Sequence, residues 1–203
     1  MKRTIFFILI AFFIIKDING QILSESELNK KPVYTSIEDA LKEPEKVYRF
    51  KLKTRADSLP EEIFQFTNLQ ELTASKCRLS IINGKIGELK NLQILDISAN
   101  QLVRLPESLC QLINLKELII NRNHIEELPT NIGNMQNLNY IDAWDNPLYS
   151  LPASITDLRY VLKEIDLRQI ELRDEELETM ERQLPETVIQ YTSTCDCHSR
   201  RGK

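Results

Sequence analysis

The sequence predicts an α/β solenoid, a fold in which short units of strand and turn stack on one another. The first observation is a period of 23 residues, which places four leucines in matching positions: Leu69, Leu92, Leu115 and Leu138. The second is the pattern of one unit, which reads Leu92-x-x-Leu95-x-Ile97-x-x-Asn100-x-Leu102-x-x-Leu105-Pro106. A fixed period of this length is typical of stacked repeats and not of a globular core.

Two further units repeat this pattern. They read Leu115, Leu118, Ile120, Asn123, Ile125, Leu128, Pro129 and then Leu138, Ile141, Ala143, Asn146, Leu148, Leu151, Pro152. The units resemble the leucine-rich repeat family in its 23-residue form, and the resemblance covers residues 47–172. It implies a curved solenoid with a concave parallel β-sheet and short helices on the convex face. It also implies the family's usual role of binding other proteins on the concave sheet, although a fold does not by itself fix a function.

Elementary geometry agrees with this architecture. Alternate side chains of a strand share a face, so Leu95 and Ile97 are expected to point inward together. Asn100 lies where the chain must turn, and its amide can both donate and accept hydrogen bonds with the backbone. The asparagines of successive units are therefore expected to form a ladder. The spacing of Leu109 and Leu112 suits a short helical segment on the outer face.

The outermost units depart from the pattern. Cys77 takes the asparagine position in the first clear unit, where a thiol is a weaker hydrogen-bonding group. Ile170 takes that position in the last unit, which also contains one extra residue. Upstream, residues 47–52 indicate a first strand, and Leu59-Pro60 closes a shortened unit. The array from 47 to 172 is thus predicted to hold about six strands.

Capping segments are predicted on both sides of the array. Residues 21–46 form the N-terminal cap, with a short helix that begins after Ser36 as its N-cap. Residues 173–192 form the C-terminal cap, in which Asp174 precedes an acidic helix from Glu175 to Gln183. A closing strand is expected at residues 188–191, after Pro185. Residues 193–203 are polar and basic, which is typical of a flexible tail.

Residues 1–20 have the pattern of a secretory signal peptide. Lys2-Arg3 precedes an apolar run from Ile5 to Ile15, which is shorter than the roughly 20 residues of a membrane span. Cleavage after Gly20 is expected, which would leave an exported protein that is periplasmic, at the cell surface or secreted. The alternative is an uncleaved short anchor. Cleavage would change the net charge from -4 to -6, which argues against nucleic acid as a partner, because such binders carry a basic stripe.

The four cysteines fall into two groups. Cys77 is expected in an inner turn and Cys110 on the outer face, too far apart for a disulfide, so both are predicted to be buried thiols. Cys195, Cys197 and His198 lie close together in the tail. They could form intermolecular disulfides or ligate a soft metal ion, but the tail offers no fourth ligand. Neither a metal nor a cofactor is therefore predicted.

Strand alternation indicates which side chains face outward on the sheet. Because neighbouring strands lie about 4.8 Å apart, outward residues of successive units should form rows. One row is expected to contain Ile94, Glu117, Tyr140 and Glu164, and the next Asp96, Ile119, Asp142 and Asp166. With Trp144, which is the only tryptophan, and Arg168, these ten residues are the predicted partner-binding set. Trp144 is expected to be substantially exposed beside Tyr140 and Asp142.

The functional hypothesis is an exported, non-enzymatic module that binds a protein or peptide on the concave sheet. Exposed Trp and Tyr side chains are common anchors of interfaces, and the sequence contains none of the usual catalytic motifs. One alternative is a structural spacer of the cell envelope that is cross-linked through Cys195 and Cys197. A hydrolase that uses the acidic rows, or a calcium site at Asp142 and Asp166, is a further reading, but such sites also need neutral ligands and turn geometry.

Overall fold

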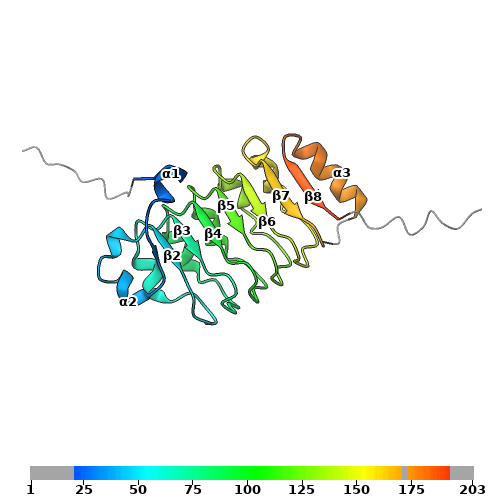
Figure 1. Cartoon of the computed structure of the whole chain (residues 1–203). Helices are drawn as coiled ribbons and strands as arrows, with labels where there is room; N and C mark the ends of the chain where they lie inside the picture. Colours follow the sequence, from blue (N-terminus) through cyan, green and yellow to red (C-terminus); the bar gives the residue numbers. More distant parts are fainter. Residues whose placement is uncertain (1–20, 171–172, 193–203) are drawn as a thin grey trace, which may run out of the picture.

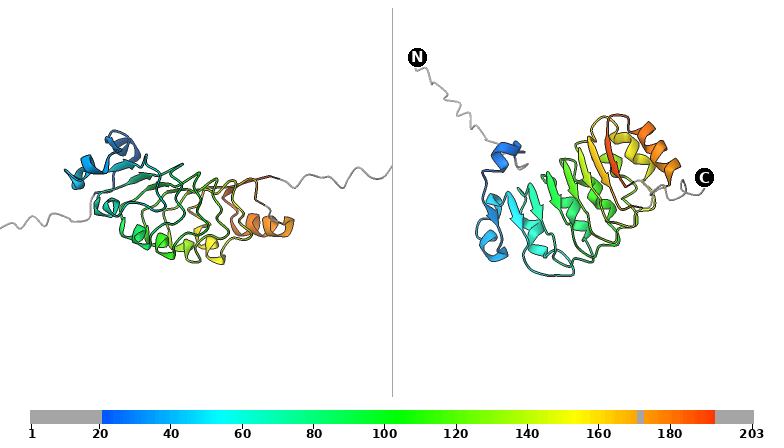
Figure 2. Two further views of the ribbon diagram at one scale, coloured as in Figure 1. Left: turned by 90° about the horizontal axis from the view of Figure 1, so that it is seen from below. Right: turned by 45° about the vertical axis from the view of Figure 1, so that its right-hand side comes forward.

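The computed structural model describes residues 21–170 and 173–192 of the chain. The predicted signal peptide, Leu172 and the tail with Cys195, Cys197 and His198 lie outside the described residues. The described chain is an elongated solenoid (Figure 1). Its strands form one continuous parallel sheet in chain order, and short helical turns lie behind them (Figures 1 and 2). This is the predicted α/β repeat architecture.

Eight strands make up the sheet, two more than the array alone was predicted to contain. They are β1 (Val33–Tyr34), β2 (Arg49–Lys51), β3 (Glu71–Thr73), β4 (Ile94–Asp96), β5 (Glu117–Ile119), β6 (Tyr140–Asp142), β7 (Glu164–Leu167) and β8 (Val188–Tyr191). The helices are α1 (Glu25–Leu28), α2 (Ile37–Ala40) and α3 (Asp174–Gln183). Short 3-10 turns occupy Pro44–Lys46, Glu61–Gln65, Gly84–Glu88, Glu107–Gln111, Ile132–Asn134 and Ala153–Leu158. Within the described residues, none of the helices is long and apolar enough to cross a membrane.

The 23-residue period fixes the register of the sheet. Leu72, Leu95 and Leu118 are paired across β3, β4 and β5, and all three are fully buried. The next pairings, to Ile141 and Ile165, continue this buried row. The connection from β6 to β7 contains one residue more than the connection from β5 to β6. The outer 3-10 turn Ala153–Leu158 in this connection is one residue longer than Glu107–Gln111. The insertion is therefore absorbed on the convex side, and the strand face keeps its alignment.

A ladder of buried asparagines holds the turn that follows each strand. The side-chain oxygen of Asn100 accepts hydrogen bonds from the backbone of Cys77 and Leu79, both at 3.0 Å. Its Nδ2 donates to the carbonyls of Ala74 and Ile97, at 2.9 and 2.8 Å. Corresponding side chains at 123 and 146 bridge the following units in the same way. Each asparagine thus satisfies buried backbone groups of its own unit and of the unit before it.

The residue before each ladder asparagine adopts a left-handed backbone conformation. Ala99, Arg122 and Asp145 have φ angles of 53°, 54° and 57°. This conformation costs a residue other than glycine about 1–2 kcal/mol. The turns are therefore strained, and the hydrogen bonds of the neighbouring asparagines offset that strain.

A second asparagine ladder, not predicted from the sequence, lies where the outer turn leads back to the strand. Nδ2 of Asn91, Asn114 and Asn137 donates to the carbonyl of Thr67, Lys90 and Ile113, respectively, at 2.7–2.8 Å. Asn68 does the same to Glu45 at 2.7 Å. The signal was present in the sequence, since an asparagine precedes each of the four periodic leucines. These bonds are exposed and tie the convex edges of successive units together.

The caps follow the sequence only in part. The predicted N-terminal helix is α2, and Ser36 Oγ accepts from the backbone of Asp39 at 3.2 Å. Two elements of this cap were not expected, α1 and the short strand β1, which extends the sheet by one strand. In the C-terminal cap, Asp174 begins α3 and Arg173 is its N-cap, one residue earlier than predicted. The structure accounts for the shift because Glu176 accepts from the Arg173 backbone at 3.0 Å.

Asn123→Ala is expected to destabilise the fold by about 1–3 kcal/mol, because it leaves buried backbone groups of two units without partners. Asn134→Ala is the matched control, since Asn134 is exposed at the end of an outer turn and should change stability by less than about 0.5 kcal/mol. Equilibrium unfolding in urea measures both. Equal midpoints for the two variants would contradict the ladder's role.

Candidate functional site

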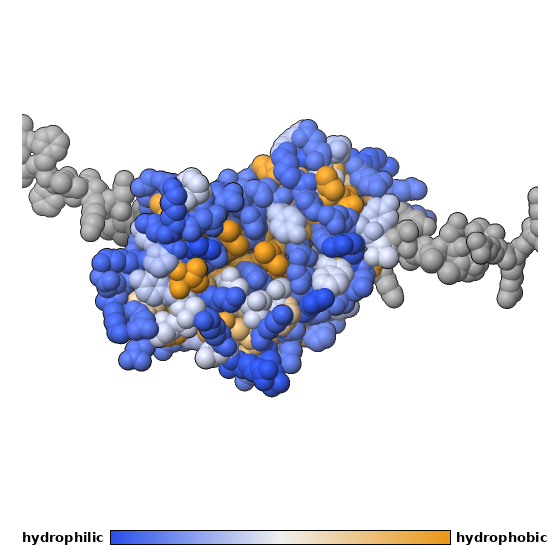
Figure 3. Space-filling view, viewed as in Figure 1, coloured by the Kyte–Doolittle hydropathy of each residue, from blue (hydrophilic) through white to orange (hydrophobic). Residues whose placement is uncertain are grey.

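The strand face presents the predicted rows of outward residues. Strand pairing aligns Glu71, Ile94, Glu117, Tyr140 and Glu164 in one row. It aligns Thr73, Asp96, Ile119, Asp142 and Asp166 in the next. In both rows apolar and acidic side chains alternate from β4 to β6. Figure 3 shows hydrophobic surface gathered near the middle of this face, with hydrophilic residues around it.

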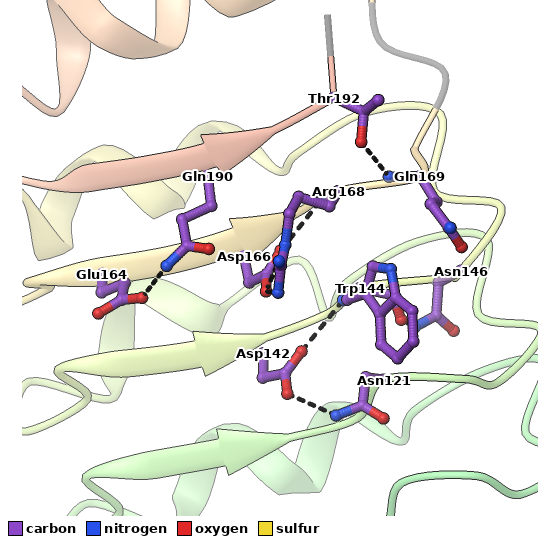
Figure 4. Close-up of polar contacts among 10 residues, drawn as sticks. All are labelled: Asn121, Asp142, Trp144, Asn146, Glu164, Asp166, Arg168, Gln169, Gln190 and Thr192. Carbon is purple, nitrogen blue, oxygen red and sulfur yellow. Dashed lines mark hydrogen bonds and ion pairs between the residues drawn. The ribbon is translucent and has the colours of Figure 1, made fainter.

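The aspartates of the second row are engaged in local structure at the ends of their strands. Asp96 Oδ1 accepts from the backbone and the hydroxyl of Ser98, at 3.0 and 2.6 Å. Asp142 accepts from the Trp144 backbone at 3.3 Å and from the side chain of Asn121 (Figure 4). Burial raises the pKa of Asp142, and these two hydrogen bonds oppose that shift. The hydrogen bonds give these carboxylates a structural role at the turns.

Asp166 departs further from the expectation of an outward contact residue. It lies in the predicted row, but only 3% of its surface is exposed. Its carboxylate is held by the guanidinium of Arg168, with Nε at 2.9 Å from Oδ1, and it also accepts from the Arg168 backbone at 3.0 Å (Figure 4). Asp166 is therefore not available to a partner, whereas Arg168 is exposed at the margin of the face. Glu164 beside it accepts from the Gln190 side chain of β8.

Trp144 is not the substantially exposed anchor that the alternation suggested. Its side chain is half-buried, and the guanidinium of Arg122 from the preceding unit lies over the indole ring at 4.3 Å from the ring centre. Arg122 has the left-handed backbone of the turn, and its amide donates to the Trp144 carbonyl at 2.8 Å. The turn geometry thus brings the cation onto the ring. Strand alternation could not reveal this, because Arg122 lies beyond the end of its strand.

Four half-buried residues remain at the centre of the face, and they adjoin one another across three strands. They are Ile94 of β4, Glu117 and Ile119 of β5, and Tyr140 of β6, and we refer to them as the central patch. Within the described residues, neither Glu117 nor Tyr140 has a side-chain hydrogen bond or an ion pair to another side chain. This separates them from the aspartates at the turns, whose carboxylates accept hydrogen bonds.

Glu117 has an unfavourable electrostatic environment. Burial raises the pKa of its carboxyl above the ordinary value, and the charges of Glu25 and Glu71 raise it further, while Lys116 opposes them. Burial also raises the pKa of Tyr140, with Asp142 as the next contribution. An ionised carboxylate that is partly removed from water, among like charges and without a hydrogen-bond donor, destabilises the folded chain.

An N-terminal arm, residues 21–29, borders this face and was not predicted. The backbone of Leu23 donates to Gln70 at 2.9 Å and accepts from Gln93 at 3.0 Å. The two glutamines are buried side by side, with Nε2 of Gln93 at 2.8 Å from Oε1 of Gln70. The carbonyl of Asn29 accepts from Arg49, which also forms a two-bond ion pair with Glu71. The arm therefore carries Glu25 of α1 to the margin of the central patch.

The cysteines of the described residues are buried, and the described histidine lies at the surface. Cys77 and Cys110 are free and buried, as predicted. Burial raises the pKa of Cys110 to about 11, which disfavours the nucleophilic thiolate. His124 is an exposed turn residue. Within the described ranges, no three His, Cys, Asp or Glu side chains are grouped so that they could hold a metal ion.

This architecture of strand, asparagine turn and short outer helix defines a leucine-rich repeat solenoid. Residues 76–190, more than half of the chain, match the family described as leucine-rich repeat region. The chain belongs to the leucine-rich repeat family. It is also similar to the solved structure of a leucine-rich repeat protein of Leptospira interrogans, with 27% identity and a TM-score of 0.61. That similarity covers 79% of this chain and 54% of the Leptospira protein, so this chain spans about half the length of the Leptospira protein. A comparison with curated proteins finds no match.

Glu117→Gln is expected to raise the melting temperature at about pH 7, because it removes a carboxylate whose ionisation is disfavoured in the folded chain. A raised folded pKa means that ionisation reduces stability as pH rises from the unfolded value through the folded one. The gain should therefore disappear at about pH 4, where the carboxyl is largely protonated in both states. Glu178→Gln, on the exposed face of α3, is the control. A melting temperature that falls at neutral pH would contradict this account of Glu117.

Proposed function

We propose that this protein is an exported, non-enzymatic binding module that holds a protein or peptide partner on its concave sheet. The observation that carries the proposal is the central patch. It is a contiguous group of apolar and aromatic side chains around one carboxylate, on a face that is otherwise polar. Membership of the leucine-rich repeat family supports a role in protein interaction.

The physical character of the central patch suits an interface core. Interface cores are enriched in aromatic residues and depleted of charge, and their rims are polar and wet. Ile94, Ile119 and Tyr140 supply such a core, while Arg168 and the turn residues supply a rim. Seven strand spacings of about 4.8 Å make the face roughly 34 Å across. A strand face of that width can hold an extended peptide or the edge of a small domain.

Three alternative functions receive less support. A hydrolase or a calcium site would need free carboxylates at converging positions. Asp142 and Asp166 instead accept hydrogen bonds from their own turns, and Asp142 also accepts from Asn121 of the preceding unit. A spacer that is cross-linked through Cys195 and Cys197 would need no apolar surface on its strand face. The central patch has no structural purpose in such a spacer, which favours binding.

Export rests on the N-terminal sequence alone. Lys2-Arg3 and the apolar run from Ile5 to Ile15 have the composition and length of a secretory signal. We propose that cleavage after Gly20 releases the chain beyond the cytoplasmic membrane. The compartment would then be the periplasm, the cell surface or the medium.

Mass spectrometry of the protein purified from its native host should find a chain that begins at or near Gln21. An uncleaved signal on a protein recovered from the soluble cytoplasmic fraction would sink the export proposal. An intact N-terminus on membrane-bound protein would instead point to the uncleaved anchor. The measurement uses untagged protein, because an N-terminal tag alters the positive region that precedes the apolar run.

The combined change Ile119→Ala with Tyr140→Ala should reduce partner capture roughly 30-fold or more, since truncation of interface anchors costs about 2 kcal/mol or more. The full chain is immobilised, incubated with an envelope and medium extract of the native host, and the retained proteins are quantified by mass spectrometry. Melting temperatures of both chains verify that the variant is folded.

The matched control removes the same two residue types from the outer side. Ile113 and Tyr160 are 56% and 66% exposed and lie in connections between the outer turns and the strands. Ile113→Ala with Tyr160→Ala should leave capture unchanged. If the outer pair abolished capture and the inner pair did not, the partner would bind the convex side and the proposal would fail.

A further inference from the structure

One carboxylate of the strand face stands apart from the others. Glu71 is paired with Arg49, Glu164 accepts from Gln190, and the three aspartates are bonded within their turns. Among the described residues, only Glu117 lacks a donor to its side chain within this group of six. It is also the carboxylate at the middle of the central patch, between Ile94 and Tyr140 in the register of the sheet.

The surroundings of Glu117 match the shape and charge of a long cationic side chain. Ile94, Ile119 and Tyr140 offer apolar surface on which the aliphatic stem of a lysine or arginine can lie. The tyrosine ring can additionally face the cation. The carboxylates of Glu25 and Glu71 are near enough to act on Glu117 electrostatically. A positive group at this point therefore meets one carboxylate that has no partner among the described residues, and Glu25 adds to the negative potential there, while Glu71 is already neutralised by Arg49.

The same row of the sheet already contains such an arrangement. Two strands away, Arg49 of β2 meets Glu71 of β3 with Nε at 2.6 Å from Oε2 and an NH2 group at 3.1 Å from Oε1. Both side chains are mostly buried, at 18% and 16% exposed. Glu71 and Glu117 occupy equivalent positions in their repeats. In β3 the chain supplies the cation itself, whereas no cation among the described residues forms an ion pair with Glu117 of β5.

We propose, on the basis of the proposed function above, that the central patch takes a lysine or arginine side chain of the protein partner, with its charged head at Glu117. The partner segment is thus basic at this position, and flanking apolar side chains rest on Ile94 and Ile119. An ion pair formed here is partly shielded from water, so it is stronger than one on an open surface. It also removes the repulsion that Glu117 experiences in the free protein.

A metal ion fits the central patch less well than a cationic side chain. Calcium takes six to eight oxygen ligands, and magnesium demands an octahedral set. The patch offers one carboxylate and a phenol among apolar groups, and no metal-sized cluster is found within the described residues. The binding of a free divalent ion is nevertheless kept as an outcome of the experiment.

The experiment titrates the isotopically labelled full chain with three capped tripeptides, followed by backbone and methyl NMR shifts. The probes are acetyl-Val-Arg-Val-amide, its citrulline analogue, which is neutral and nearly the same shape, and acetyl-Val-Glu-Val-amide. The arginine probe should shift the resonances of Ile94, Glu117, Ile119 and Tyr140. It should bind about fivefold more tightly than the citrulline probe, and the difference should shrink as salt rises.

The variant Glu117→Gln should bring the arginine and citrulline probes to within about twofold of each other, while Glu178→Gln on α3 should keep the full difference. Equal binding of the two probes to the wild-type chain overturns the inference. So does discrimination that survives in Glu117→Gln, or a stronger shift of the same resonances by calcium chloride alone.

Failure of this inference alone can be distinguished from failure of the proposed function. If the native partner is captured through Ile119 and Tyr140 but Glu117→Gln captures it equally well, the module binds on this face without a cation at Glu117. The proposed function then stands and this inference falls. If neither change alters capture, the partner does not bind on this face, so the proposed function and this inference both fall, and discrimination by the arginine probe shows only that Glu117 can bind a cation.

Discussion

The hydrogen bonds of the buried asparagines are the interaction on which the rest of this structure depends. Each asparagine satisfies backbone groups of two successive units, so it stabilises its own turn and also links that unit to the one before it. Residues such as Ala99 and Arg122 have a left-handed backbone in these turns, although they lack the conformational freedom of glycine. Without the hydrogen bonds of the asparagine side chains, that backbone strain and the unsatisfied buried polar groups would oppose folding. With them, every unit repeats one geometry and the strands remain in register.

The register of the strands determines which side chains lie next to one another on the strand face. Because each strand from β4 to β8 begins 23 or 24 residues after the strand before it, side chains that are distant in the sequence become neighbours on the sheet. The extra residue of the last unit enters an outer turn and does not shift the strand face. The central patch exists only because this alignment is kept. A slip of one residue in β5 would turn Glu117 into the core and Leu118 outward.

The periodic features of the fold could be predicted from the sequence, whereas contacts outside the repeat pattern could not. The 23-residue pattern predicted the strands, the asparagine ladder and the two outward rows, since these depend on local spacing. It could not predict that Asp166 is buried under Arg168 or that Arg122 covers Trp144, because alternation indicates a face and not the neighbours on it. The N-terminal arm was missed for another reason. Its hydrogen bonds join residues that are separated by 47 and by 70 positions in the sequence, and the repeat pattern does not predict such contacts.

The acidic residues of the strand face separate into two kinds once their hydrogen bonds are known. Asp96, Asp142 and Asp166 accept bonds from their own turns, so their presence is explained by the fold. Glu117 accepts none from the described residues, and its surroundings disfavour its charge. A half-buried charged group that has no hydrogen-bond or ion-pair partner among the described residues is best explained by a contact with another molecule. That reasoning, and not the total of negative charge, favours the centre of β5 as the proposed site of partner recognition.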